Sequence, residues 1–299
     1  MSCRYEDLPI PFRGRLLLGE PMQLHTSLKV GGPADLYAIP EDTDDLTSLL
    51  SWLEESNIPW LMIGRGYNLL VRDKGIRGAV ISLEKFNHIT AIDGSMIKAE
   101  AGVENLALVR FAQGKGLGGI GFISGIPGTI GGAIKMNAGA YGKGILERTD
   151  HLTLLRNGNV HEVRIDELDY GYRHLKLEVG DIVLAATFSL EECEPHHTEE
   201  QIRNDLELRR TKHNVGYPSA GSFFKNPQEQ AAWRFIDSAG MRGVKVGAAQ
   251  VSEVHSNFLV NIGGATCQNF LDLAKIVKNA VHATSGVTLE EEVRIVGQI

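Results

Sequence analysis

The spacing of apolar residues predicts that the chain opens with a strand, a helix and a second strand. Residues 28–40 hold a glycine-proline turn followed by an apolar run typical of a strand. Residues 41–57 predict an amphipathic helix, with Thr43 as its cap, acidic residues in its first turn and leucines on one face. These leucines are Leu46, Leu49, Leu50 and Leu53. Residues 58–66 form an apolar run ending in glycines, so we expect a βαβ unit with parallel strands.

Strand and helix patterns continue to alternate through the first two thirds of the chain. Short strands are expected between residues 76 and 101, and a helix that ends in glycine is expected at 104–119. Residues 151–174 predict a hairpin with Asn157-Gly158 at its tip, because this dipeptide favours a tight turn. A further strand is expected at 181–192.

A polar stretch at residues 193–201 interrupts the pattern and predicts a domain boundary. The elements expected beyond it are helices at 198–213, 229–243 and 267–286 and strand-like segments at 248–265 and 290–297. This second part is therefore expected to be α+β.

Composition limits the classes of function. A chain of 299 residues is too long for one ordinary core, so two or three domains are expected. The formal net charge of −7 argues against a general nucleic-acid binder.

No apolar run is long enough for a membrane span, and the first residues lack the apolar core of a signal peptide. Three scattered cysteines indicate reduced thiols in a cytoplasmic protein. No metal site is expected, since His196-His197 fits a solvated linker better.

Two glycine-rich segments are candidate phosphate-binding loops, because glycine lets backbone N–H groups approach a phosphate closely. IGRGYNLLVRDKGIRG, at residues 63–78, is equally well explained as a turn at the end of a strand. SGIPGTIGGAIKMNAGAYG, at residues 124–142, is more specific, since it is apolar, glycine-rich and almost uncharged. It predicts a backbone pressed against a large flat ligand or its pyrophosphate, with a tightly packed set of turns as the alternative.

A serine stands between a glycine and two phenylalanines in YPSAGSFFKNP, at residues 217–227. Ser222 does not fit an acyl-transfer nucleophile, because Phe224 occupies the place of the second glycine of that motif. The alternatives from these residues are a turn serine that bonds its own backbone and a hydroxyl that donates a proton.

Six motifs occur in order along the chain: KVGGPA, G-x-G-x-N-L-L-V, SGIPGTIGGAIKMNAGAYG, the Tyr-Arg of DYGYRH, AGSFFKNP and EVRIVG. Together they resemble the UDP-N-acetylenolpyruvoylglucosamine reductase family over roughly residues 24–297. The short interval between Arg173 and Ser222 resembles the shorter subclass, which lacks a tyrosine-bearing substrate loop.

The resemblance implies an α+β fold in which a two-part FAD-binding domain (PCMH-like, of the vanillyl-alcohol-oxidase type) precedes an α+β substrate-binding domain. The implied boundaries are 1–84 and 85–195 for the two FAD-binding subdomains, 196–285 for the substrate domain and 286–299 for a returning C-terminal strand. It further implies non-covalent FAD, NADPH as reductant and a UDP-sugar substrate, in a cytoplasmic monomer or weak homo-oligomer that binds neither nucleic acid nor membrane.

By the same resemblance, reduced flavin delivers hydride to the β-carbon of an enolpyruvyl ether, and a proton then reaches the α-carbon. Arg173 and Glu292 match the family residues that stabilise the charge arriving on the substrate carboxylate, and Ser222 matches the proton donor. Read from local sequence alone, Arg173 and Glu292 are a surface arginine and a strand-edge acid. The closest rival is another FAD oxidoreductase of this fold acting on an alcohol or hydroxy acid; a flavin-binding regulator without turnover ranks lower.

Binding residues follow from the same match. The expected cofactor-binding residues are Gly64, Arg65, Gly66, Tyr67, Asn68, Leu69, Ser124, Gly125, Ile126, Pro127, Gly128, Thr129, Gly131, Gly132, Ala133, Asn137 and Gly139. The expected substrate-binding residues are Lys212, Lys225, Asn226, Arg242 and His255; for His255 and Asn257, polar packing in the core is an equal alternative. Tyr67 and Leu175 depart from the family, which commonly has serine at both places.

Overall fold

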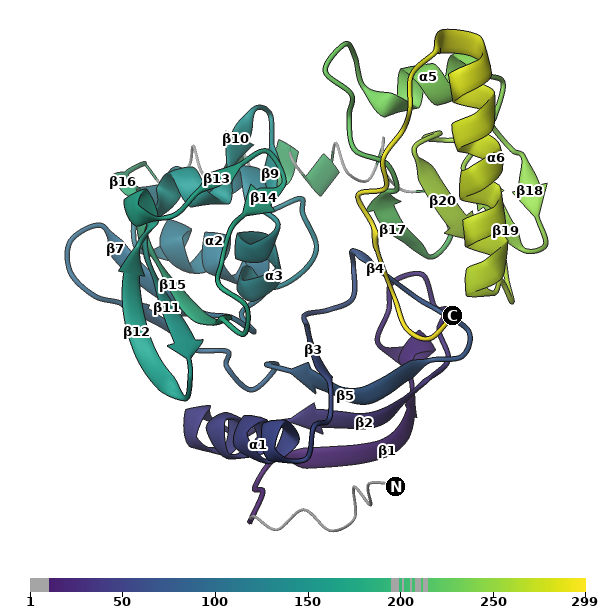
Figure 1. Ribbon diagram of the computed structural model, residues 1–299. Helices are drawn as coiled ribbons and strands as arrows, with labels where there is room; N and C mark the ends of the chain where they lie inside the picture. Colours follow the sequence, from purple (N-terminus) through teal and green to yellow (C-terminus); the bar gives the residue numbers. More distant parts are fainter. Residues whose placement is uncertain (1–10, 195–198, 201, 205, 208–210, 212–214) are drawn as a thin grey trace. The chain divides into compact units, whose positions relative to one another are not determined.

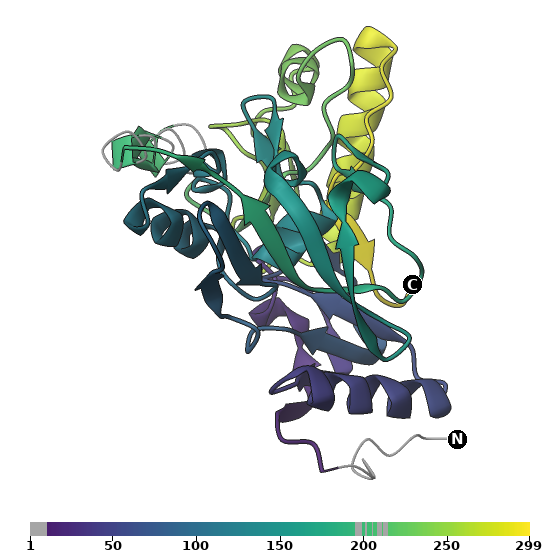
Figure 2. The same cartoon turned by 90° about the vertical axis from the view of Figure 1, so that its left-hand side faces the viewer.

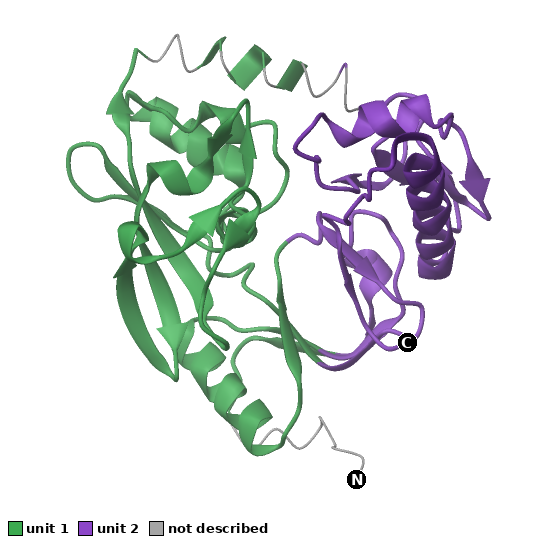
Figure 3. Cartoon of the chain, turned by 45° about the horizontal axis from the view of Figure 1, so that its top comes forward, with its two compact units in different colours: residues 1–17, 37–64, 79–207 green, residues 18–36, 65–78, 208–299 purple. Residues whose placement is uncertain are grey.

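The computed structural model describes residues 11–194, 199–200, 202–204, 206–207, 211 and 215–299. The chain divides into two compact units (Figure 3). Unit 1 comprises residues 1–17, 37–64 and 79–207, and unit 2 comprises residues 18–36, 65–78 and 208–299. Each unit is therefore built from segments that lie far apart in the sequence. None of the helices that the structure describes has the length and apolar character needed to span a bilayer.

The first sheet corrects the expected βαβ pairing. Its strands are β1 (Arg15–Pro21), β2 (Pro33–Ile39), β5 (Ile76–Ser82) and β3 (Trp60–Ile63), in the order β1-β2-β5-β3. The two strands that flank the predicted helix are β2 and β3, and they are not neighbours. β5 lies between them and pairs in parallel with β3, as Figure 1 shows. The parallel partner of β3 thus comes from later in the chain.

Helix α1 (Thr43–Glu55) forms where the leucine spacing predicts it, and Leu46, Leu49 and Leu53 are fully buried. Its cap is Asp42 rather than Thr43, because the Asp42 carboxylate accepts a hydrogen bond from the Asp45 N–H at 3.0 Å. An aspartate and a threonine both cap well, so the sequence alone could not decide between neighbouring candidates.

Unit 1 also contains a five-stranded antiparallel sheet in the order β12-β11-β15-β7-β6. Its strands are β6 (Ile89–Ala91), β7 (Met96–Glu100), β11 (Thr149–Arg156), β12 (Asn159–Arg164) and β15 (Ile182–Ser189). The predicted hairpin is confirmed: β11 and β12 meet at Asn157 and Gly158, whose φ angles of 48° and 75° are those of a tight turn. The unit's core packs this sheet against α2 (Asn105–Gly114) and α3 (Ile130–Lys135).

Short elements complete unit 1. They are β8 (Leu117–Gly118), η3 (Gly121–Ile123), β9 (Gly139–Ala140), β10 (Lys143–Gly144), η4 (Ile145–Arg148), η5 (Ile165–Glu167), β13 (Tyr170–Gly171), β14 (His174–Leu175) and β16 (Glu191–Glu192). Of these, β13 and β14 form a two-stranded hairpin, and β9 pairs with β10.

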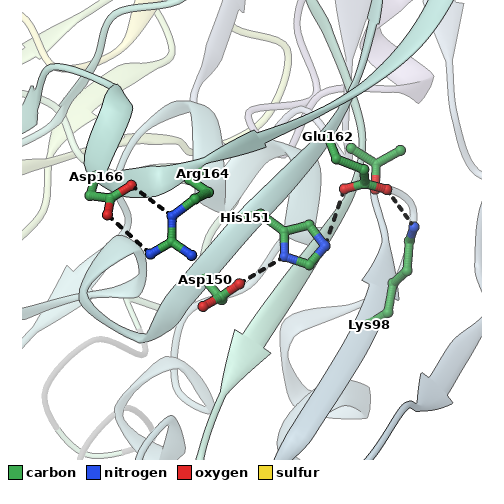
Figure 4. A network of polar contacts seen from close by, with 7 residues as sticks. Lys98, Asp150, His151, Glu162, Arg164 and Asp166 are labelled. Atoms are coloured by element: carbon green, nitrogen blue, oxygen red, sulfur yellow. Dashed lines mark hydrogen bonds and ion pairs between the residues drawn. The ribbon is translucent and has the colours of Figure 1, made fainter.

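Charged side chains on β7, β11 and β12 and beside them form a surface network (Figure 4). His151 lies 2.9 Å from the Asp150 carboxylate and 3.1 Å from that of Glu162, which also pairs with Lys98 at 3.2 Å. Exposed ion pairs each contribute only about 0–1 kcal/mol to stability. The network includes none of the predicted site residues.

Unit 2 is α+β, as predicted. Its sheet has the order β17-β20-β19-β18, from strands β17 (Ser219–Ser222), β18 (Lys245–Val246), β19 (Ala249–Val251) and β20 (Phe258–Asn261). Two helices accompany it, α5 (Ala232–Ser238) and the long α6 (Cys267–Ser285), which is yellow in Figures 1 and 2. α6 begins at a Thr266–Asn269 capping box and ends at Gly286, whose φ is 72°.

Early and late segments of the chain meet within unit 2. η2 (Met22–Leu24) and β4 (Leu69–Val71) come from the first quarter of the sequence, and β4 pairs in parallel with the closing strand β21 (Arg294–Val296). The Asp73 carboxylate accepts hydrogen bonds from the first N–H groups of α6, at 2.7 Å from Cys267 N and 3.0 Å from Gln268 N. Burial raises the pKa of the Cys267 thiol to about 12, so this cysteine is an unreactive core residue.

Candidate active site

The two glycine-rich motifs meet in unit 1. A Cβ built on Gly64, directly after β3, would stand 2.8 Å from the Thr129 hydroxyl oxygen. The beginning of the first motif therefore lies against the threonine of the second, which is the N-cap residue of α3. This juxtaposition could be expected from the family resemblance but not from strand and helix patterns.

Asn105, the first residue of α2, fixes the loop before Thr129. Its side-chain amide donates to the Ile126 carbonyl at 3.0 Å, and its backbone N–H donates to the Gly128 carbonyl at 3.1 Å. Asn105 itself is buried. Both loop carbonyls are thereby bound on the side of α2.

At Gly128, close packing by neighbouring residues does not explain why the loop has a glycine. Its φ is 130°, which side chains rarely adopt, and a Cβ there would meet nothing within 4 Å among the described residues. Gly132 likewise has room, with the Thr129 hydroxyl oxygen 3.9 Å from a built Cβ. Open space beside glycine is the arrangement that permits close approach of a ligand.

Other glycines of the motifs are explained by packing within the protein. A Cβ at Gly131 would stand 2.9 Å from the Ala101 Cβ, and one at Gly139 would stand 2.0 Å from the Lys143 carbonyl oxygen. In unit 2, a Cβ at Gly66 would stand 2.0 Å from the His25 carbonyl oxygen. Here the alternative of tightly packed turns suffices, and no ligand is needed to account for the glycine.

The remaining motif residues of unit 1 lie around this loop. Ile126 and Ala133 pack against the unit's hydrophobic core, and Ser124 is buried. Gly125 and Pro127 are half-buried.

Arg173 lies in the two-residue turn between β13 and β14, with a φ of 55°. This left-handed conformation is uncommon for residues other than glycine, and it costs arginine about 1–2 kcal/mol. The guanidinium lies 3.4 to 3.5 Å from the carbonyl oxygens of Asn137 and Gly139 and stacks 5.3 Å from the Tyr172 ring. A strained residue held by its surroundings is characteristic of functional sites.

Asn137 ties the second motif to this turn. It is buried, with a φ of 40°, and its side chain donates to the Gly171 carbonyl at 2.8 Å and accepts from the Leu146 N–H at 3.2 Å. These bonds make Asn137 a structural link between the glycine-rich segment and the hairpin that carries Arg173. Leu175, which departs from the family's common serine, is buried in the unit's core and so has a packing role.

Ser222 ends strand β17 in unit 2, next to a β-bulge. Ser219 is opposite Val260 and Ser222 is opposite Phe258, so three steps along β17 match two along β20. Gly221 takes the extra step with a φ of 74°. Ser222 is half-buried, and among the residues that the structure describes none hydrogen-bonds to its hydroxyl. The structure therefore gives no support to the alternative of a turn serine that bonds its own backbone.

The segment of Glu292 runs beside the residues that follow Ser222. The Glu292 N–H donates to the Phe223 carbonyl at 2.8 Å, and the Lys225 N–H donates to the Glu290 carbonyl at 2.9 Å. Two of the three candidate catalytic residues thus belong to neighbouring antiparallel segments of one unit. Arg173 belongs to the other unit.

Asn68 fixes the backbone around Glu292. Its side chain donates to the Glu292 carbonyl at 3.1 Å, and its own carbonyl accepts from the Arg294 N–H at 3.1 Å. Leu69, the next residue, is buried in β4. Arg65 and Tyr67 are both exposed, and Tyr67 is the residue that stands where the family commonly has serine.

The expected substrate-binding residues have varied surroundings. Lys225 forms an exposed ion pair with Glu290 at 3.2 Å, and the Asn226 side chain accepts from the Ala232 N–H at the start of α5 at 3.0 Å. His255 lies with its ring 4.6 Å from that of Phe258. Lys212 lies outside the described residues.

Arg242 is engaged by its own unit. Its guanidinium donates to the Glu253 carbonyl at 2.6 Å and to the Asp237 carboxylate at 2.7 Å. Partial burial would raise the pKa of Asp237, but the hydrogen bonds from Arg242 and Ser256, together with the charge of the Arg242 guanidinium, hold the pKa below its usual value.

Known proteins match nearly the whole chain. A family model described as the C-terminal domain of UDP-N-acetylenolpyruvoylglucosamine reductase matches residues 213–296, and one described as an FAD binding domain matches residues 34–163. The UDP-N-acetylenolpyruvoylglucosamine reductase of Pelobacter propionicus is 70% identical over 286 residues, which cover 96% of this chain and 97% of that protein. The chain belongs to the UDP-N-acetylenolpyruvoylglucosamine reductase family. The family resemblance expected from the six motifs is confirmed.

Two further members of the reductase family define the extent of the likeness. The Geotalea uraniireducens protein of the same name is 54% identical over 285 residues, covering 95% of each chain. The crystal structure of the Thermus caldophilus reductase is 31% identical, has a TM-score of 0.81 and covers 95% of this chain and 98% of that one. The predicted α+β fold, with an FAD-binding region before a family-specific C-terminal domain, is confirmed.

The residues of unit 1 fit the FAD that membership of the reductase family implies. Gly128 and Gly132 leave space where a side chain would stand, and the carbonyls of Ile126 and Gly128 are bound by Asn105. A loop of this kind can turn backbone N–H groups, rather than carbonyls, toward a phosphate.

Two asparagines with clear roles were missed or left undecided from sequence. Asn105 was not singled out, because an asparagine at the start of a helix is common and its partners are loop carbonyls about 20 residues away. Asn257 was left between core packing and a site role. The structure shows that it is buried and bonded to the Phe223-Phe224 backbone.

Proposed function

We propose that this chain reduces UDP-N-acetylglucosamine enolpyruvate to UDP-N-acetylmuramate, a peptidoglycan precursor, with Arg173, Ser222 and Glu292 as its catalytic residues. One observation carries the assignment of residues. Ser222 lies at a bulge, its hydroxyl has no hydrogen-bond partner among the described residues, and the Glu292 N–H is bonded to the carbonyl of Phe223, the residue directly after the strand.

The chemistry explains why these residue types are needed. An enolpyruvyl double bond is electron-rich and accepts hydride only if its conjugated carboxylate can hold the arriving charge. That charge gives an enediolate-like species with two negatively charged oxygens. Groups that bind this species more strongly than the substrate accelerate the reaction.

Arg173 binds the substrate carboxylate in this proposal. Its planar guanidinium can donate two parallel hydrogen bonds to the carboxylate oxygens, and its positive charge stabilises the enediolate. The strained turn supports this role, because a backbone strain of this kind is retained where the side chain must point in one direction.

Glu292 stabilises the same oxygens as a hydrogen-bond donor in its protonated form. A carboxyl that stays protonated beside a carboxylate substrate can share its proton with the developing charge. The backbone bonds from Asn68 and to Phe223 hold the residue in register for this contact.

Ser222 donates the proton to the α-carbon. A serine hydroxyl is a very weak acid, so it can protonate only a strongly basic carbon held within hydrogen-bond reach. Lys225 lies three residues further on and could stabilise the alkoxide or the substrate, although its side chain now pairs with Glu290.

When bound, FAD supplies the hydride for this reaction after reduction by NADPH. The candidate residues that hold it are those of the two glycine motifs, with Gly128 and Gly132 as the positions best supported by geometry. Asn137, Asn68 and Leu69 support the site through structural bonds and packing.

The substrate diphosphate and sugar are bound by residues of the C-terminal domain. The candidates are Lys212, Lys225, Asn226, Arg242 and His255, since cations suit a diphosphate on an otherwise acidic protein. We place the reaction in the cytoplasm, in a monomer or weak homo-oligomer. The domain limits proposed are 1–84, 85–195, 196–285 and 286–299.

The test is spectroscopic. The purified protein should show a visible flavin spectrum that anaerobic NADPH bleaches and UDP-N-acetylglucosamine enolpyruvate restores. If only oxygen or another acceptor restores the colour, the substrate is wrong and the rival oxidoreductase of the same fold is favoured. A protein that stays colourless after addition of FAD would refute the flavin assignment itself.

A further inference from the structure

The backbone hydrogen bonds that pair β17 with β20 end next to Asn257. We infer that the Asn257 side chain positions the Ser222 hydroxyl by holding the backbone that follows Ser222. This inference rests on the proposed function, because it assigns a residue that aims the proposed proton donor. Asn257 is 1% exposed and directly precedes β20. It is a positioning residue and not a catalytic one, since it acts through the backbone of Phe223 and Phe224.

The Asn257 side chain continues the ladder by one residue. The Phe223 N–H donates to the Asn257 backbone carbonyl at 2.7 Å, as expected one step beyond the Ser222–Phe258 pair. At Phe224 the bonds come from the side-chain amide of Asn257 instead of its backbone. The amide accepts from the Phe224 N–H at 3.0 Å and donates to the Phe224 carbonyl at 2.8 Å. One amide group thus imitates a backbone peptide and binds both polar groups of a single residue.

The residue type is specific to this arrangement. An asparagine amide offers an acceptor and two donors in one plane, which few side chains of its length can do. Alanine would leave the N–H and the carbonyl of Phe224, a fully buried residue, without these partners. Aspartate would keep the acceptor and lose the donor.

The other edge of the segment is held by backbone hydrogen bonds, beside the exposed Lys225–Glu290 ion pair. Glu292 N–H bonds to the Phe223 carbonyl and Lys225 N–H bonds to the Glu290 carbonyl. Before Ser222, none of the described residues lies within 4 Å of a Cβ built on Gly221, so no side-chain packing supports the serine from that side. The direction of the Ser222 side chain is therefore determined from its C-terminal side, where Asn257 supplies the side-chain contribution.

Asn261 provides a matched control on the same strand. It is also buried, and its side chain makes three bonds to backbone, against two for Asn257: to the Leu28 carbonyl at 3.0 Å, and from the N–H groups of Gly263 and Ala265 at 3.0 and 3.1 Å. None of these partners adjoins Ser222 in sequence. Asn261→Ala therefore removes a comparable set of bonds without touching the backbone that aims the hydroxyl.

The experiment uses the FAD-loaded enzyme, reduced with NADPH and mixed anaerobically with UDP-N-acetylglucosamine enolpyruvate in H2O and in D2O. Product formation in a single turnover is measured for wild type, Asn257→Ala, Asn257→Asp and Asn261→Ala. In Asn257→Ala we expect product formation to slow about tenfold or more, since small misplacements of a reacting group are costly. Its solvent deuterium isotope effect should exceed that of wild type, because proton donation becomes limiting. The rate of flavin reduction by NADPH should be unchanged.

The outcomes separate the inference from the function on which it rests. Asn261→Ala should lose thermal stability comparably and keep the wild-type isotope effect, and Asn257→Asp should lie between wild type and Asn257→Ala. Equal isotope effects in Asn257→Ala, Asn261→Ala and wild type would overturn the positioning role alone. If Asn257→Ala does not fold, the same comparison is made with Asn257→Asp. A wild-type enzyme whose reduced flavin forms no product would instead overturn the proposed function, and the inference with it.

Discussion

Arg173 in unit 1 and Ser222 in unit 2 are carried by backbones of different kinds. Arg173 lies in a two-residue turn with a left-handed φ of 55°, and its surroundings are two carbonyls at 3.4 to 3.5 Å and an exposed tyrosine ring. Ser222 follows a glycine that takes the unusual φ itself, and the segment after it is bonded along both edges. Arg173 therefore adopts the strained left-handed backbone conformation itself, whereas next to Ser222 that conformation is adopted by Gly221, which tolerates it.

The difference suits the two proposed tasks. A long guanidinium side chain reaches its target through many rotatable bonds, so its backbone must limit where it begins. A serine hydroxyl has one rotatable bond before its oxygen, and its position follows the backbone directly. Substitutions that alter the backbone at the two sites should therefore change turnover and the free energy of unfolding in different proportions.

Removing the Ser222 hydroxyl should have the largest effect. Ser222→Ala is expected to lower turnover by about 10²- to 10⁴-fold, which is the usual contribution of a general acid. Reduction of the flavin by NADPH, followed by its absorbance in a stopped-flow instrument, should be unaffected. Ser219→Ala, on the same strand, serves as the control and should retain turnover. Equal activity in the two variants would refute the role of Ser222.

Changes at Arg173 should give the next largest loss. Arg173→Ala and Arg173→Gly are both expected to reduce turnover by about 10²- to 10³-fold, as for other donors to a developing oxyanion. Their stabilities should differ, because glycine relieves the left-handed strain. Arg173→Gly should be more stable than Arg173→Ala by about 1 kcal/mol in chemical denaturation. Equal stabilities would show that the strain is absent in solution.

Substitution at the bulge tests whether Gly221 protects the serine. Gly221→Ala should cost about 1–2 kcal/mol, because a Cβ is strained at a φ of 74° although it meets no atom. It should also lower turnover about tenfold by displacing Ser222. Gly286→Ala is the matched control, with a φ of 72° and equally open space at the end of α6. It should lose similar stability and keep full turnover; parallel losses of turnover would contradict the comparison.

The smallest effect on turnover is expected at Asp181, which lies outside the hairpin of Arg173 and bonds to Arg156. Its buried carboxylate accepts two hydrogen bonds of 2.8 Å from Arg156, which hold the pKa of Asp181 below its usual value near 4. The folded state thus favours the ionised form, and this stability is present above about pH 4 and is lost as the pH falls through the lowered value.

Asp181→Asn should therefore lower the Tm at neutral pH and leave turnover unchanged. The difference in Tm between wild type and variant should shrink as the pH is lowered from 6 to 3. A constant difference across this range would show that the Arg156 pair does not favour the ionised carboxyl.

Local features of the fold could be predicted from the sequence because their causes lie within a few residues. The leucine spacing located α1, and Asn157-Gly158 located the hairpin tip. The place of β5 between β2 and β3 could not be predicted, since nothing in the strand sequences specifies which later strand will enter the sheet. The cap of α1 was missed by one residue because two good capping residues are adjacent.

The same limit applies to the candidate site. Ser222, Arg173 and Glu292 were located through motifs, and the structure places Ser222 and Glu292 on neighbouring segments. The bonds that hold them were not predictable, because Asn257 acts on a residue 33 positions away and Asn68 on one 224 positions away. Several motif glycines also proved to be fixed by contacts with their own protein, which sequence could not distinguish from ligand contacts.

The pairing of β21 with β4 has a consequence for synthesis. Leu28, Val30 and Leu70 belong to the same core as Val277, Leu289 and Val293, so unit 2 needs residues that are synthesised both before and after the core of unit 1. Unit 1 builds its largest core from residues 97–206 and can begin to fold much earlier. A nascent chain interrupted before Glu292 would hold both glycine-rich motifs and Ser222 but lack the strand that pairs with β4. β4 therefore lacks its partner strand until translation reaches β21, whereas β2 and β5 can pair earlier.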